Sequence, residues 1–228
     1  MTAVTHHNVT MIRRVAIALG PLRERVVFLG GATAGLLITD PAGAGFRPTK
    51  DVDLIVEVAS TIVYATVLRD ELLRLGFRED TSNGAPLCRW LFEDLIVDVM
   101  PTVGSVLGFS NRWYAVAMAT ATDLDLPGGP RVRIVTAPAF LATKLDAFED
   151  RGHGDYQASH DLEDMIAVVD GRSEVVDEVA NADPHLVAYV ATMLRRLLAD
   201  QSFIAALPGH LPPDAASQNP PASAHSKA

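Results

Sequence analysis

The stretch FRPTKDVDLIVEV, residues 46–58, places Asp51 and Asp53 at the start of an otherwise apolar run. The β-branched residues that follow them predict a buried strand. Side chains alternate between the two faces of a strand, so both carboxylates point to one face while Val52 and Leu54 point to the other. Two like charges this close repel each other unless a cation lies between them. The stretch therefore predicts a sheet strand with a cation site at its start.

The chemistry of the pair indicates which cation it would hold. Oxygen ligands favour a hard ion such as Mg²⁺, which takes one or two carboxylates and completes its shell with water and substrate phosphate. A third acid, Asp98, interrupts the apolar run LIVDVMP at residues 95–101. If its strand lies beside that of Asp51, the three carboxylates would hold two Mg²⁺ ions, or Mn²⁺ in their place, for in-line phosphoryl displacement. The alternative is that the acids are solvated strand ends, the commoner situation for an isolated pair.

A glycine turn precedes this strand. RVVFLGG, residues 25–31, predicts a short strand that ends in a turn, and ATAGLLI, residues 32–38, predicts a helix. A turn that runs into a helix presents free backbone N–H groups and the positive end of the helix dipole, which favour an anion such as a triphosphate. The candidate triphosphate-binding turn contains Gly30, Gly31 and Thr33.

The rest of the chain divides into a sheet-rich part and a helical part. Apolar periodicity predicts helices over 8–22 and 60–75, and a hairpin whose strands flank Glu93 and Asp94. The segments 114–126 and 130–137 are interpreted as two more strands around a tight turn, and the pattern from Pro138 onward is helical. The expected fold class is α/β (α+β), with a mixed-sheet core over 1–135, a helical region over 136–207 and a disordered tail over 208–228.

Composition excludes several classes of protein. The chain of 228 residues has 28 acidic and 19 basic residues and a formal net charge of −9, so it lacks the basic field of a non-specific nucleic-acid binder. A nucleic acid would need a local patch, for which Arg131, Arg133 and the segment RRLLADQ at 195–201 are candidates. The lone Cys88 excludes an intrachain disulfide and a cysteine-based zinc cluster. The absence of a long apolar run and of a signal-peptide pattern predicts a cytoplasmic protein with no membrane partner.

The combination of motifs resembles a known family. GGATAGLL, RPTKDVDLIV and LIVDVM are similar to the signature of the polymerase-beta-like nucleotidyltransferase superfamily, and the resemblance extends over residues 25–170. TKLDAFEDRG and SHDLEDM resemble the C-terminal motifs of its AbiEii-like branch, the nucleotidyltransferase toxins of toxin-antitoxin systems. The 19 residues between Gly31 and Asp51 exceed the expected spacing, and 40–46 is interpreted as an insertion.

The resemblance implies roles for particular residues. Asp51 and Asp53 would ligate both metal ions, and Asp98 would hold the catalytic metal and help to deprotonate the acceptor hydroxyl. Lys144 would contact the triphosphate, whereas its alternative is a solvated side chain on a helix. Arg151 would grip a phosphate or form a helix-terminal ion pair. The full set of candidate substrate-binding residues is Gly30, Gly31, Thr33, Lys50, Lys144, Asp146, Arg151 and Asp161.

The resulting hypothesis is a metal-dependent enzyme that transfers NMP from an NTP such as ATP to an acceptor hydroxyl and releases pyrophosphate. The resemblance implies a tRNA 3′ end as acceptor, a toxin as the biological role and a cognate antitoxin as partner. One alternative keeps the chemistry but changes the acceptor to a small molecule, as in aminoglycoside nucleotidyltransferases, or to a protein hydroxyl. An alternative of another class is a non-catalytic nucleotide- or partner-binding relative, which the presence of all three acids disfavours.

Overall fold

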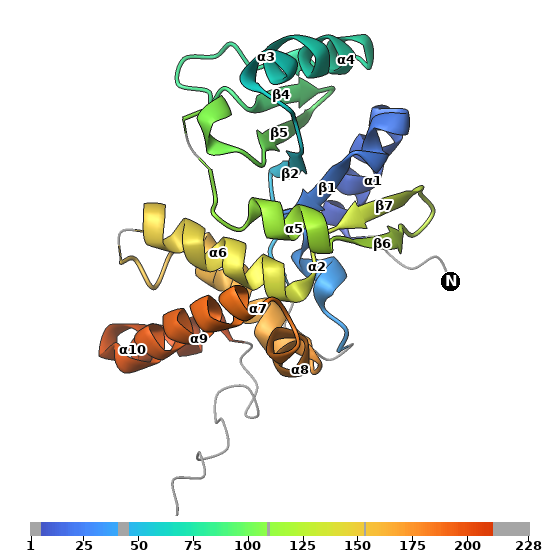
Figure 1. Cartoon of the computed structure of the whole chain (residues 1–228). Helices are drawn as coiled ribbons and strands as arrows, with labels where there is room; N and C mark the ends of the chain where they lie inside the picture. The colour runs from blue at the N-terminus through green and yellow to red at the C-terminus, as the bar shows by residue number, and fades with distance from the viewer. Residues whose placement is uncertain (1–5, 41–45, 109, 153, 212–228) are drawn as a thin grey trace, which may run out of the picture.

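A computed structural model describes residues 6–40, 46–108, 110–152 and 154–211. Its centre is a seven-stranded mixed sheet in the order β3-β4-β5-β2-β1-β7-β6 (Figure 1). The expected α/β (α+β) class, with a mixed sheet followed by helices, is confirmed. Most of the interpreted insertion and most of the expected tail, residues 41–45 and 212–228, lie outside the described residues.

The strands are short, and the helices become longer after the sheet is complete. The strands are β1 Val26–Leu29, β2 Asp51–Val56, β3 Arg78–Glu79, β4 Arg89–Phe92, β5 Leu95–Pro101, β6 Thr122–Asp125 and β7 Arg131–Ile134. The α-helices are α1 His7–Leu19, α2 Ala34–Leu37, α3 Thr61–Val63, α4 Arg69–Arg74, α5 Tyr114–Thr120, α6 Ala137–Arg151, α7 His160–Gly171, α8 Val175–Ala180, α9 Pro184–Ala199 and α10 Gln201–His210. Short 3₁₀ segments are η1 Gly20–Glu24, η2 Gly31–Thr33 and η4 Gly104–Val106, and a π-helical turn, η3 Tyr64–Leu68, joins α3 to α4.

The register of the central strands decides which side chains share a face. β2 runs antiparallel to β1 and parallel to β5, and Asp53 lies directly beside Asp98 in the β2–β5 pair. The expected placement of the Asp98 strand next to the Asp51 strand is therefore confirmed. β4 and β5 form the expected hairpin, in which Arg89 lies opposite Asp98. Side chains directly opposite each other in adjacent strands point to the same face, so the three meet on one side of the sheet.

One segment differs from the sequence interpretation. Tyr114–Thr120 is the helix α5, not a strand, and only Thr122–Asp125 continues as the edge strand β6. Three of the seven residues of α5 are alanine, the residue with the highest helix propensity, and Ala117 is fully buried. The alternating apolar pattern of this segment also fits a short helix that packs one side on a sheet, and α5 contacts β1 and β2.

The helical part packs around α6, which begins with Pro138 in its first turn and buries most of its length. It contacts α5, α7, α8 and α9 (Figure 1). α7 begins at the cap Ser159, whose side chain accepts a hydrogen bond from the Leu162 N–H. α10 continues to His210, past the expected start of the tail at 208. Within the described ranges, no helix has the length and apolarity needed to cross a membrane.

Candidate active site

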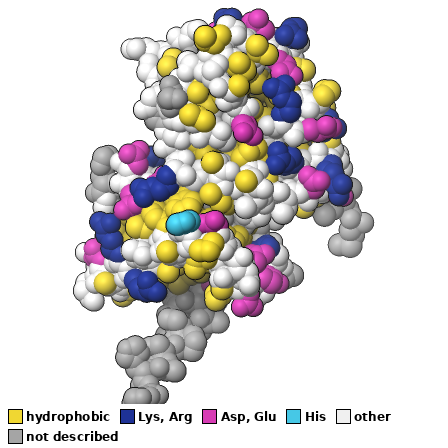
Figure 2. Space-filling model, viewed as in Figure 1, with side chains coloured by type: hydrophobic (Ala, Val, Ile, Leu, Met, Phe, Trp, Pro, Cys, Tyr) yellow, Lys and Arg dark blue, Asp and Glu magenta, His cyan; other side chains and the backbone are white. Residues whose placement is uncertain are grey.

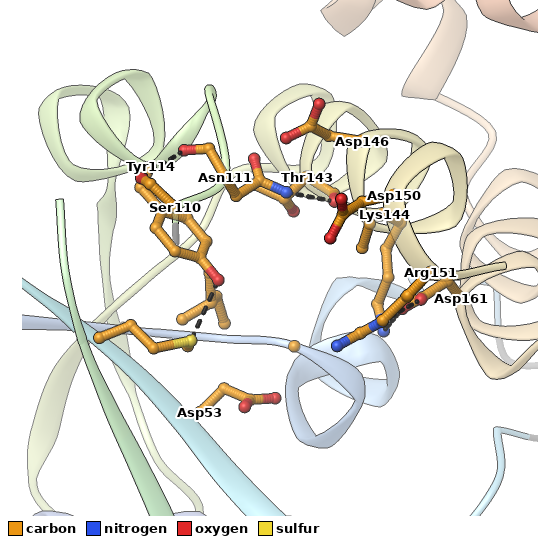
Figure 3. Close-up of a pocket in the computed structure, with 14 residues that line it drawn as sticks. Asp53, Ser110, Asn111, Tyr114, Thr143, Lys144, Asp146, Asp150, Arg151 and Asp161 are labelled. Atoms are coloured by element: carbon orange, nitrogen blue, oxygen red, sulfur yellow. Dashed lines mark hydrogen bonds and ion pairs between the residues drawn. The ribbon is translucent and has the colours of Figure 1, made fainter. Parts of the chain in front are cut away.

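A cleft separates the sheet from α6 and α7. It consists of two adjoining hollows that share Asp53, Lys144, Arg151 and Asp161 as common walls. We call them the sheet-side hollow and the helix-side hollow. The sheet-side hollow is further lined by Gly31, Arg47, Pro48, Lys50, Asp51, Arg89, Asp98, Gly152, Asp155, Ala158, Ser159, His160 and Glu163. The helix-side hollow, drawn in Figure 3, is further lined by Leu29, Gly30, Met100, Ser110, Asn111, Tyr114, Thr143, Asp146, Ala147 and Asp150.

Asp51, Asp53 and Asp98 form the carboxylate face of the sheet-side hollow. Burial, followed by the negative charges of Asp51 and Asp98, raises the pKa of Asp53 to about 7. Lys144 and Arg151 act in the opposite direction but do not cancel these effects. Part of the Asp53 surface remains open to the cleft, so an incoming cation can reach the carboxylate.

The raised pKa predicts a pH-dependent penalty on folding. The folded-state value of about 7 exceeds the reference value of 3.8, so the stabilising contribution of the bound proton is complete below about pH 4 and is lost as the pH rises through 7. We expect Asp53→Asn to raise the Tm in metal-free buffer at about pH 8, and much less at about pH 5. Thermal unfolding in the presence of a chelator measures this difference. The exposed Asp125 provides the control variant Asp125→Asn, and an equal pH slope for wild type and Asp53→Asn would contradict the expectation.

Arg89 takes part in the carboxylate face, which the sequence analysis missed. Its Nε and Nη2 donate to the two carboxylate oxygens of Asp98 at 2.9 and 2.8 Å. A signal for this pair was present, because a hairpin that turns at Glu93 and Asp94 places residue 89 opposite residue 98. Asp98 thus has a protein partner, whereas no described residue forms an ion pair with Asp51 or Asp53.

The carboxylates of Asp51 and Asp53 determine whether the cleft can hold a divalent ion. Across the described part of the chain, no three Asp, Glu, His or Cys side chains are arranged as a ready-made metal-binding group. Asp51 and Asp53 alone still fit the chemistry of Mg²⁺, which accepts one or two carboxylates and takes its other ligands from water and substrate. These two residues would hold the ion.

The glycine turn lies against the carboxylate face. Gly30 has φ 73°, and a Cβ at this position would lie 1.8 Å from Oδ2 of Asp53. A Cβ on Gly31 would lie 2.8 Å from Oδ2 of Asp164 and 2.9 Å from Nη2 of Arg47. Thr33 is fully buried, and its hydroxyl donates to the Gly30 carbonyl at 2.8 Å. Gly30 and Gly31 thus permit the close approach of backbone and charged groups, while Thr33 braces the turn and does not line either hollow.

A substitution at Gly30 tests this close approach. Gly30 has φ 73° and ψ −170°, a backbone conformation that only glycine adopts readily, so we expect Gly30→Ala to lower the free energy of unfolding by more than the roughly 1–3 kcal/mol of such backbone strain, because the new Cβ also displaces Asp53. Gly84 has φ 83° and no heavy atom within 4 Å of a built Cβ, so Gly84→Ala measures the backbone cost alone. Chemical denaturation of both variants gives the comparison, and equal losses would show that the contact with Asp53 is unimportant.

Five charged side chains form an ion-pair chain along one wall of the cleft. Asp164 accepts from Arg47 Nε at 2.9 Å and from Lys144 Nζ at 2.6 Å. Asp161 accepts from Lys144 Nζ at 3.2 Å and from Arg151 Nε at 3.0 Å. Arg47 Nε also lies 3.8 Å from a carboxylate oxygen of Glu163, so the three cations of this wall face three anions and their formal charges cancel.

The ion-pair chain decides between the alternatives for Lys144 and Arg151. The Lys144 side chain is 8% exposed and is not solvated. Burial acts to lower its pKa, but Asp164 and Asp161 outweigh burial, and the net pKa is raised. Arg151 forms the helix-terminal ion pair with Asp161, yet its side chain is 68% exposed and lines both hollows. In Figure 3, Lys144, Arg151 and Asp161 lie across the cavity from Asp53.

The sequence analysis did not predict the ion pair between Arg47 and Asp164 or the role of Asn8 in holding the loop that carries Arg47. Asn8 of α1 is fully buried, donates to the Arg47 carbonyl at 3.0 Å and accepts from the Thr49 N–H at 3.1 Å. This pair of bonds holds the loop immediately before β2 and thereby places Arg47 at Asp164. Lys50 in the same loop is exposed and lines the sheet-side hollow.

The outer rim of the helix-side hollow is acidic. Asp146 is buried and accepts a hydrogen bond from the Arg112 backbone N–H at 3.0 Å, and its carboxylate also pairs with the Arg112 side chain. Glu149 and Asp150 on the same helix lie beside it in the surface depression next to this hollow. Asp146 therefore contributes to the rim and does not belong to the ion-pair chain.

The arginines of the expected nucleic-acid patch do not form one patch. Arg131 pairs with Asp123 and Asp125 on β6, and Arg133 donates to the Met118 carbonyl at 3.0 Å. Arg196 lies on α9 and pairs with Glu149. On the face shown in Figure 2, Lys and Arg side chains are interspersed with Asp and Glu.

Comparison with known proteins identifies the fold. No protein-family profile and no curated protein sequence matches this chain. A solved structure, an antigenic nucleotidyltransferase-like protein from Paracoccidioides brasiliensis, superposes with a TM-score of 0.53 and 22% identity over 87% of this chain and 92% of that chain. The fold is nucleotidyltransferase-like.

Two further solved structures of lower similarity also match this chain. ANT(2″)-Ia in complex with adenylyl-2″-tobramycin gives a TM-score of 0.46 and 16% identity over 84% of this chain and 99% of that chain. The solution structure of antibiotic-resistance factor ANT(2″)-Ia gives 0.47 and 15% over 84% and 92%. The AbiEii-like branch of the resemblance stays a prediction.

Proposed function

We propose that this protein transfers NMP from an NTP to an acceptor hydroxyl and releases pyrophosphate. The observation that carries the proposal is the position of the unpaired acids Asp51 and Asp53, which face the glycine turn at Gly30 and the cations Lys144 and Arg151 within one cleft. Phosphoryl-type transfer needs positioning and charge neutralisation more than covalent help from the protein. This cleft offers a cation site, a closely approaching backbone turn and the exposed cation Arg151.

Each group has a distinct task in the proposed reaction. When bound, Mg²⁺ supplies Lewis-acid stabilisation of the negative charge on the phosphates. Arg151 is exposed enough to leave Asp161 and contact a phosphate, whereas the buried Lys144 holds Asp161 and Asp164 in place. The acceptor hydroxyl oxygen attacks the α-phosphorus and its proton passes to solvent water, while the bond to the bridging α–β oxygen breaks and pyrophosphate leaves with the electron pair.

The resemblance to AbiEii-like toxins supports a tRNA 3′ end as the acceptor, a toxin role and a cognate antitoxin. The ion pairs of Arg131 and Arg196 mean that tRNA would have to compete for these side chains or bind elsewhere. The second candidate acceptor is a small cationic molecule with a hydroxyl. The rim contains Asp146, Glu149 and Asp150 against the two cations Arg112 and Arg196 that pair with the first two, and the remaining negative charge favours this candidate, because opposite charge concentrates the acceptor at the cleft mouth. A protein hydroxyl is a third acceptor for the same chemistry.

The decisive experiment incubates the purified full-length protein with Mg²⁺ and each α-³²P-labelled NTP in turn. One series contains total bacterial tRNA and is resolved on a denaturing gel, and a parallel series contains tobramycin and is resolved by thin-layer chromatography. Label on tRNA supports the toxin proposal, and label on tobramycin supports the small-molecule alternative. Label on the protein itself would support the third acceptor. Absence of transfer in every series, together with absence of Mg²⁺–NTP binding, would overturn the proposed function.

A further inference from the structure

We propose that the Arg89 guanidinium takes the place of one divalent cation at the carboxylate face, so that this chain holds a single ion between Asp51 and Asp53. The inference rests on the proposed function, because it concerns the ion of that reaction. It departs from the expectation of two ions that the family resemblance implies. Asp98 would then serve as the residue that positions Arg89, and not as a metal ligand.

Arg89 and Asp98 are placed for pairing by the sheet itself. Arg89 and Asp98 are directly opposed in the antiparallel β4–β5 register, so their side chains rise on the same face without any bend of the backbone. Both carboxylate oxygens receive a hydrogen bond, at 2.9 and 2.8 Å. This parallel two-bond arrangement is the strong and directional form of an arginine–carboxylate pair. The carboxylate is therefore engaged before any ion arrives.

Displacement of Arg89 from Asp98 by a metal ion would be costly. The side chains of Arg89 and Asp98 are 27% and 11% exposed, so the pair is partly shielded from water. A second divalent ion at Asp98 would have to break the pair and leave the guanidinium without a partner beside the ion. Removal of one partner from a shielded pair is costly, and two adjacent cations also repel each other.

The charges of the carboxylate face and Arg89 together match one divalent ion. Asp51, Asp53 and Asp98 carry three negative charges, and Arg89 carries one positive charge, which leaves a net charge of −2. One divalent ion neutralises this remainder. A second ion with Arg89 still in place would leave the carboxylate face at +2.

The consequence is a fixed positive charge over the cleft. Arg89 lines the sheet-side hollow together with Asp51 and Asp53, so its guanidinium lies where substrate would contact the carboxylate face. Unlike a metal ion, which must be bound from solution, the arginine is part of the protein and is present at any concentration of free metal. The chain would thus depend on one metal-binding equilibrium, at Asp51 and Asp53.

Counting bound Mn²⁺ tests the proposal without reference to turnover. Purified full-length protein is titrated with Mn²⁺ alone near pH 8, and free Mn²⁺ is measured by its electron paramagnetic resonance signal. We expect one Mn²⁺ per wild-type chain, at least about tenfold weaker binding for Asp53→Asn, and a second bound Mn²⁺ in Arg89→Gln. In Arg89→Gln/Asp98→Asn the second ion should disappear while the first remains within a few fold of its wild-type affinity.

A matched control removes a similar ion pair away from the cleft. Arg69 donates to Glu79 through Nε and Nη2 at 2.8 and 3.0 Å, so Arg69→Gln should retain one Mn²⁺. Circular dichroism spectra establish that each variant is folded. Two bound Mn²⁺ in the wild type would overturn the proposal. A loss of affinity for the first Mn²⁺ in Arg89→Gln/Asp98→Asn as large as that in Asp53→Asn would also overturn it. If the wild type bound no Mn²⁺ at all, the metal site of the proposed function would fail together with the inference.

Discussion

If the proposed function holds, Asp53→Ala is expected to reduce NMP transfer by on the order of a thousandfold or more, because the ion that Asp53 would help to hold stabilises transition-state charge by several kcal/mol. The carboxylate lies at the centre of the cleft, beside Asp98 in the sheet and within contact distance of the position of a Gly30 Cβ. Replacement removes a ligand but also removes the repulsion from Asp51 and Asp98. The variant should therefore be folded and inactive.

The measurement is single-turnover transfer of labelled NMP to whichever acceptor the wild type labels. Thermal unfolding of the same preparation shows that the loss is not a loss of structure. Asp125→Ala is the matched control, because Asp125 is an exposed strand aspartate paired only with Arg131. Transfer by Asp53→Ala at more than about a tenth of the wild-type rate would show that the metal site lies elsewhere.

Lys144→Met is expected to lower the free energy of unfolding by roughly 1.5–3 kcal/mol, because two buried carboxylates each lose one of their charged hydrogen-bond donors. Asp164 is 1% exposed and Asp161 is 9% exposed, and both accept from the same ammonium group. Arg47 and Arg151 remain at the two ends, so each carboxylate would retain one cation. Methionine has nearly the same length as lysine, so lost packing contributes little to the change.

A double-mutant cycle separates charge from packing. Adding Asp164→Asn to Lys144→Met should recover part of the lost stability, because one of the two carboxylates that lost the lysine is then replaced by a neutral amide. Denaturant unfolding gives the free energies for the four members of the cycle. Arg196→Ala serves as the control, because its pair with Glu149 is exposed and its removal should change stability little. A loss for Lys144→Met as small as that for Arg196→Ala would contradict the proposed role of the buried lysine.

Local sequence patterns were sufficient for much of the fold. The two-residue alternation of DVDLIV placed Asp51 and Asp53 on one face of β2, and the polar Glu93–Asp94 turn set the β4–β5 hairpin. These features depend on neighbours along the chain. The α5 segment was misassigned because its seven residues are too few for periodicity to distinguish a helix from a strand.

The candidate site could be predicted only in part, for a physical reason. Alternation along β2 implied that two carboxylates need a counter-charge, and this holds in any fold that contains the strand. Which groups supply that charge depends on distances between segments far apart in the sequence. Asp164 meets Arg47 across a separation of 117 residues and Lys144 across 20. Only the packing of α6 on α7 and α5, and of α7 on α2 and η2, brings these side chains together, excludes water from Lys144 and turns scattered charges into one wall of a cleft.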